Sequence, residues 1–105
     1  MLNLALKLCK KSDHRQHHHG CIVTRGGAVV AMGYNRGETH AEVAALKKMW
    51  PSERKGTKLW SIRFLKSGRF GMAKPCKNCM KFIIESGVKV LYYTDETGSI
   101  IRVKL

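Results

Sequence analysis

The sequence is poor in acidic residues, in proline and in long hydrophobic runs, and each shortage narrows the class of protein. Seven Asp and Glu stand against 20 Lys and Arg, which leaves a formal net charge of +13 at pH 7. Two prolines and ten glycines among 105 residues exclude a collagen-like or low-complexity chain. No apolar run approaches the roughly 18 residues that a membrane-spanning helix needs, so we expect no membrane partner.

Length and composition predict a single folded domain that spans residues 1–105. Hydrophobic residues make up 44% of the chain and charged residues 26%, which is an ordinary globular balance. A chain of this length can bury one hydrophobic core but not two. Lys7 interrupts the apolar N-terminal stretch and no small-residue cleavage site follows, so we interpret it as an amphipathic helix and not a signal peptide. We therefore expect an intracellular, cytoplasmic protein.

The positive charge is concentrated in the middle of the chain. From Lys47 to Lys89 the sequence has twelve basic residues and two acidic ones, Glu53 and Glu85, so this stretch alone carries +10. Such a surplus favours an anionic partner, either nucleic acid or the phosphates of a nucleotide. The simpler alternative is a basic surface that has no dedicated ligand.

Hydrophobic periodicity and turn residues predict the element order α-β-β-α-β-α-β-β. We expect helices at residues 2–12, 40–50 and 76–86, and strands at residues 21–24, 28–34, 58–65, 88–94 and 99–105. Residues 12–20 are expected to form a polar loop, and residues 67–74 a glycine-hinged one. Helical connections imply a parallel centre, whereas hairpins imply antiparallel edges. The expected fold is α/β, with three α/β/α layers around a mixed five-stranded sheet whose last strand is antiparallel.

A Cys-x-x-Cys pair is the clearest chemical motif. Cys76 and Cys79 follow Pro75 directly, at the start of a predicted helix. A thioredoxin-type redox pair is one interpretation, but the usual Cys-Gly-Pro-Cys core is missing. A zinc ribbon is another, but it needs a second Cys-x-x-Cys motif that the sequence does not have. The third interpretation takes a further metal ligand from elsewhere in the chain, and His40 is the obvious candidate.

Two motifs together resemble the signature of the zinc-dependent cytidine/deoxycytidylate deaminase superfamily. They are His40-Ala41-Glu42 and, 33 residues after Glu42, Pro75-Cys76-Lys77-Asn78-Cys79. Gly33-Tyr34-Asn35 before the first motif and the segment 87–93 after the second extend the resemblance over roughly residues 3–95. Either motif alone is weak, whereas the pair in this order, each opening a predicted helix, is highly specific.

The resemblance implies a catalytic zinc site with one Zn²⁺ per chain. His40, Cys76 and Cys79 would be its protein ligands, with a fourth position left for water. Zinc lowers the pKa of such a water to around 7. Glu42 would not be a ligand. It would take the water's proton, pass it to N3 of the base and later help ammonia to leave.

Five further residues are candidates for contacting the substrate. By resemblance, the backbone of Ala41 approaches the edge of the pyrimidine, and Asn35 contacts the sugar or its substituents. Asn35 as a plain turn residue is the alternative. In the loop before Pro75, Arg69 and Lys74 are candidates for gripping phosphate, and Phe70 for stacking on a base. The alternative there is an exposed basic loop with Phe70 turned inward.

Several of these residues also have purely structural interpretations. Thr39 and Glu42 match a capping box, in which the glutamate only closes the first turn of the helix. Cys9 and Cys21 lie on apolar faces and are expected to be buried free thiols. One cluster of histidines is expected to be a solvated loop, with a place at the substrate entrance as the alternative: His14, His17, His18 and His19.

The sequence narrows the substrate only in part. The short turn 95–98 predicts the antiparallel last strand of cytidine-type enzymes, so we favour cytosine over adenine. The short loop between Asn35 and His40 favours an open pocket. With the basic charge, this predicts hydrolysis of cytosine to uracil in single-stranded DNA or RNA, with free cytosine nucleotides as the alternative. A third hypothesis is a basic nucleic-acid-binding domain with a structural zinc. Relatives commonly assemble, so a homo-oligomer is also expected.

Overall fold

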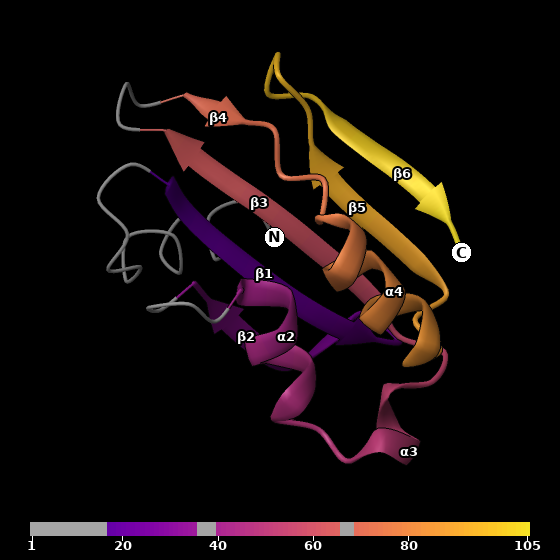
Figure 1. Cartoon of the computed structure of the whole chain (residues 1–105). Coiled ribbons are helices and arrows are strands. Elements are labelled where there is room, and N and C mark those ends of the chain that lie inside the picture. Colours follow the sequence, from indigo (N-terminus) through magenta and orange to yellow (C-terminus); the bar gives the residue numbers. More distant parts are fainter. Residues whose placement is uncertain (1–16, 36–39, 66–68) are drawn as a thin grey trace.

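The computed structural model describes residues 17–35, 40–65 and 69–105, and Figure 1 shows its arrangement. The described strands are β1 (His17–Arg25), β2 (Ala28–Tyr34), β3 (Lys58–Leu65), β4 (Phe70–Gly71), β5 (Val90–Thr94) and β6 (Ile100–Lys104). The described helices are α2 (Ala41–Lys47), α3 (Pro51–Arg54) and α4 (Lys77–Glu85). The helix predicted at residues 2–12 lies outside the described residues. No helix in the described part of the chain is long and apolar enough to cross a membrane.

The strands form one mixed sheet in the order β2-β1-β3-β5-β6. β3 and β5 are parallel, because α4 forms the crossover between them, and the other neighbouring pairs are antiparallel. The predicted α/β class, the mixed sheet and the antiparallel last strand are therefore confirmed. The two-residue β4 pairs with β3 and adds a sixth strand within the segment that was predicted to be a loop.

Two predicted boundaries are wrong. The histidine-rich segment does not stay a loop as far as Gly20, since β1 begins at His17 and residues 17–20 pair with residues 62–65 of β3. The long partner strand supplies the backbone hydrogen bonds, and this tertiary pairing overrides the polar composition. The helix predicted at residues 40–50 ends at Lys47, and a separate helical turn, α3, begins at Pro51, where proline is favoured.

The two longer helices, α2 and α4, cover the same face of the sheet (Figure 1). Beneath them lies the main core, which includes Leu46 of α2, Leu59 of β3 and Ile83 of α4. The other face carries a second cluster around Ile22 and Ile62. The helix expected to complete the third layer is the one predicted at residues 2–12, which the structure does not describe.

Gly33 allows α2 to lie directly on β2. A Cβ atom at this position would stand 2.5 Å from the backbone nitrogen of Ala45 and 2.6 Å from the carbonyl oxygen of Ala41. Both distances are shorter than real Cβ atoms tolerate, so only glycine permits this approach. The glycine of the Gly-Tyr-Asn motif therefore sets the height at which the first turn of α2 sits above the sheet.

Candidate metal centre

The starts of α2 and α4 bring the three predicted ligands together. His40 is the N-cap residue of α2, Cys76 is the N-cap residue of α4, and Cys79 lies in the first turn of α4. The Nδ1 atom of His40 is 3.1 Å from Sγ of Cys79 and 3.8 Å from Sγ of Cys76. All three donor atoms lie within 4.8 Å of one another.

This geometry fits a zinc ion. With Zn–S bonds of about 2.3 Å and a Zn–N bond of about 2.0–2.1 Å, tetrahedral donors are separated by about 3.6–3.8 Å. The His40–Cys76 distance of 3.8 Å matches that spacing, whereas the His40–Cys79 distance of 3.1 Å is about 0.5 Å shorter. The nitrogen and sulfur donors are those that zinc prefers. Among the described residues, no fourth His, Cys, Asp or Glu joins the group. Three protein ligands with a position left over are typical of a catalytic zinc site, whereas structural sites are closed.

The buried thiol of Cys79 is hard to ionise on its own. Burial, a hydrogen bond with Cys76 and the negative charge of Glu42 together raise the pKa of Cys79 to about 12. A metal ion that binds here must therefore displace a proton from this thiol.

Glu42 is buried beside the metal ligands, with only 1% of its surface exposed. Its Oε1 accepts a hydrogen bond from the hydroxyl of Ser61 at 3.0 Å and lies 3.2 Å from Nε2 of His19. Its Oε2 is buried and has no hydrogen-bond partner among the described residues. A buried acceptor without a partner is costly, so this oxygen requires an explanation. The capping-box alternative depends on Thr39, which lies outside the described residues.

The sequence did not identify His19 and Ser61 as part of the site. His19 falls in the segment that was predicted to be a loop, although its place at the substrate entrance had been the stated alternative for the histidine cluster. Ser61 belongs to the strand predicted at residues 58–65 and was not singled out there, yet it is fully buried. β3 is the central strand of the sheet. A small polar residue on a central strand is therefore the signal that could have found Ser61.

Asn35 acts within the sheet in this structure. Its side-chain Oδ1 accepts a hydrogen bond from the backbone nitrogen of His19 at 3.0 Å, and its own backbone nitrogen donates to the carbonyl of His19 at 3.1 Å. Asn35 therefore fixes the backbone of a residue that touches Glu42. Ala41 is fully buried where α2 meets Gly33. The predicted contacts of both residues with substrate stay predictions.

The candidates in the loop before Pro75 lie in different places. Phe70 is half-buried and packs edge-on against Phe64, with ring centroids 5.8 Å apart, in the cluster on the face opposite the helices. This favours the inward-facing alternative for Phe70. Arg69 and Lys74 are exposed.

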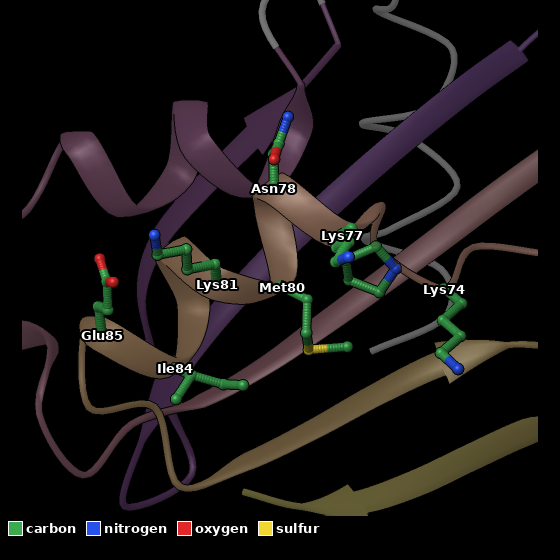
Figure 2. Close-up of a pocket in the computed structure, with 8 residues that line it drawn as sticks. Lys74, Lys77, Asn78, Met80, Lys81, Ile84 and Glu85 are labelled. Carbon is green, nitrogen blue, oxygen red and sulfur yellow. The ribbon is translucent and has the colours of Figure 1, made fainter.

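A groove of about 840 Å³ runs along the outer side of α4 (Figure 2). Lys74, Lys77 and Lys81 give it positive charge, and Met80 and Ile84 give it an apolar floor. Its lining includes Pro75 but none of the three metal-binding residues and not Glu42. The groove therefore lies beside the metal centre and does not enclose it.

Comparison with known proteins agrees with this geometry. The family model described as the cytidine and deoxycytidylate deaminase zinc-binding region matches residues 1–95. The dCMP deaminase of the cyanophage S-TIM5, in apo form, is 26% identical over 91% of this chain and 80% of its own, with a TM-score of 0.70. Its structure in complex with dCMP and dUMP gives 24% identity over 90% and 78% of the two chains, with a TM-score of 0.65.

A second solved protein shares the fold. RibD of Acinetobacter baumannii, form 1, is 18% identical over 90% of this chain, with a TM-score of 0.71. The match covers 26% of RibD, so the present chain spans about a quarter of that protein. No curated protein sequence matches the chain.

Proposed function

The chain belongs to the cytidine and deoxycytidylate deaminase family with its zinc-binding region, and we propose that it hydrolyses the amino group of cytosine in a free cytosine nucleotide. The observation that carries this proposal is the buried Glu42, whose Oε2 has no partner among the described residues, beside the group formed by His40, Cys76 and Cys79. The missing partner of Oε2 is explained if this oxygen faces the reacting water and the base.

His40, Cys76 and Cys79 would hold the zinc ion. When bound there, zinc supplies a Lewis acid that lowers the pKa of a water molecule to about 7. The described residues offer no other side chain that would occupy the remaining coordination position, so water has access to it. His40 and Cys76 are exposed, so a metal ion held by them would be accessible to a nucleotide.

Glu42 moves the proton during the reaction. Its carboxylate accepts a proton from the attacking water and delivers it to N3 of the cytosine ring, while the hydroxide oxygen forms a bond to C4. The bond between C4 and the amino nitrogen then breaks. That nitrogen leaves as ammonia after it receives the second proton of the water, again through Glu42. One water is consumed, uracil and ammonia are formed, and no oxidant or reductant is needed.

Two observations support a free nucleotide as the substrate. The similarity to the dCMP deaminase of cyanophage S-TIM5 covers 91% of the present chain. In addition, β6 is antiparallel to β5, as we expect for enzymes that act on cytidine-type monomers. The lysines of the groove beside the metal centre are suited to the phosphate of such a nucleotide.

Single-stranded nucleic acid is the second candidate, because the net charge of +13 favours a polymer with many phosphates. A panel of dCMP, CMP and a cytosine-containing oligonucleotide, assayed for ammonia release by the zinc-loaded protein, separates the candidates. We expect release from a monomer. Release from the oligonucleotide alone would replace the proposed substrate with the polymer, and release from none of them would contradict the proposed activity.

A further inference from the structure

We infer that His19 is a positioning residue, which together with Ser61 holds Glu42 by its Oε1 so that Oε2 faces the reacting atoms in a fixed orientation. This inference rests on the proposed role of Glu42 as the proton carrier. It adds to that role two residues from β1 and β3, which neither of the zinc-binding motifs contains.

The contacts form a closed triangle around one carboxylate oxygen. Nε2 of His19 is 3.2 Å from Oε1 of Glu42 and 2.5 Å from Oγ of Ser61, and Oγ is 3.0 Å from the same Oε1. His19 has 18% of its side chain exposed, whereas Glu42 and Ser61 are buried. Interactions of this kind, shielded from water, hold a side chain more firmly than exposed ones.

Counting protons identifies the tautomer of His19. The hydroxyl of Ser61 has one proton, and it lies within hydrogen-bond distance of Glu42 and also of the carbonyl of Ala73, at 2.9 Å. If Nε2 of His19 carried no proton, that single hydroxyl would face three acceptors. With a proton on Nε2, two donors meet the two acceptors, Oε1 of Glu42 and the carbonyl of Ala73. Burial lowers the pKa of His19, so the ring is neutral at pH 7 and carries this one proton.

The triangle is anchored to the segment that carries the metal ligands. The hydroxyl of Ser61 also lies 2.9 Å from the carbonyl oxygen of Ala73, which precedes Cys76 by three residues. On the other side, Asn35 holds the backbone of His19 with two hydrogen bonds. The position of the Glu42 carboxylate is therefore fixed relative to the metal-binding segment, which proton transfer over a short distance requires.

A set of matched variants tests the inference. His19→Leu removes the donor, His19→Gln places an amide N–H near the position of Nε2, and His18→Leu is the control on the same strand. His18 points to the other side of β1, because successive side chains alternate. The assay is ammonia release by zinc-loaded protein, with kcat, KM and bound zinc measured for each variant.

We expect His19→Leu to lower kcat by about 10- to 100-fold, the size of effect that a small misplacement of a catalytic group produces. KM should change by less than about threefold and the zinc content should be unchanged, because substrate and metal contacts are intact. His19→Gln should recover most of kcat, and His18→Leu should match the wild type. An unchanged kcat in His19→Leu, or no recovery in His19→Gln, would overturn the inference.

The ring nitrogens of His19 provide a readout that does not depend on turnover. In ¹⁵N NMR spectra of the wild type at pH 7, we expect the proton on Nε2, and we expect its signal to shift in Glu42→Gln. A proton on Nδ1, or a signal insensitive to Glu42→Gln, would refute the triangle. If wild-type protein released no ammonia, the proposed function would fail, while these spectra would still decide the contact between His19 and Glu42.

Discussion

The Sγ atom of Cys79 lies 3.1 Å from the Nδ1 atom of His40, although 39 residues separate them in the sequence. Each residue stands at the beginning of a different helix, and both helices rest on the same face of the sheet. The distance between these two atoms is therefore a product of the whole fold, since it depends on how α2 and α4 sit on their strands.

The metal ligands can be tested one at a time. Cys79→Ser and His40→Ala should each weaken zinc binding by more than the roughly 10- to 100-fold that loss of an outer contact costs, because each removes a direct ligand. Zinc affinity measured by competition with a chelator provides the test. Cys21→Ala is the control, since Cys21 is buried and is not one of the group. Equal zinc affinity in Cys79→Ser and in the control would refute the site.

Gly33→Ala tests the close contact between α2 and β2. The added methyl group would collide with the backbone of Ala45 and Ala41, so α2 must move away from the sheet. We expect a loss of about 1–3 kcal/mol in the free energy of unfolding, as for other overpacked sites. Urea unfolding measures it. Val30→Ala, at an exposed position of the same strand, should change stability by no more than about 0.5 kcal/mol. Equal stability of the two variants would contradict the contact.

His19 should make stability depend on pH. Burial lowers its pKa, as do the charges of His40 and Arg63, whereas Glu42 raises it. Below about pH 6.5 the unfolded chain therefore takes up a proton that the folded chain does not, and the free energy of unfolding falls with falling pH. In His19→Gln this part of the decrease should be absent. Urea unfolding of both proteins at pH 7.5 and 5.5 measures the difference, and identical slopes would show that His19 is not buried as neutral imidazole.

Salt should distinguish the two candidate substrates. Binding of a polymer through several lysine and arginine contacts releases counterions, so kcat/KM for an oligonucleotide would fall by orders of magnitude between 50 and 200 mM salt. For dCMP, with one phosphate, we expect a decrease of only a few-fold. The measurement is kcat/KM at both concentrations for each substrate. A steep salt dependence for dCMP would show that electrostatic interactions other than one phosphate contact contribute to its kcat/KM.

The sequence predicted the sheet and the ligand group well, because both leave local patterns. The alternation in residues 58–65 and the run at 88–94 mark β3 and β5, and the two motifs at helix starts mark His40 and the cysteines. Gly87 follows α4 with a φ of +84°, the left-handed conformation in which glycine commonly ends a helix.

The part of the site that the sequence could not predict depends on contacts between strands. His19 looks like part of a polar loop until β3 pairs with it, and Ser61 looks exposed until the sheet order places β3 at its centre. Phe70 resembles a base-stacking residue by its place in a basic loop, yet the edge contact with Phe64 holds it on the opposite face of the sheet. Each of these outcomes is set by tertiary packing, and only Ser61, as a small polar residue on a central strand, leaves a signal in the sequence.

The most direct test of the account is the activity of Glu42→Gln relative to wild type, with one zinc ion bound per chain in both. Glutamine keeps the size of the side chain but cannot carry the proton. We expect ammonia release from the preferred cytosine nucleotide to fall by at least about 10²- to 10⁴-fold with zinc retained. Zinc-loaded Glu42→Gln that works at the wild-type rate would contradict the account.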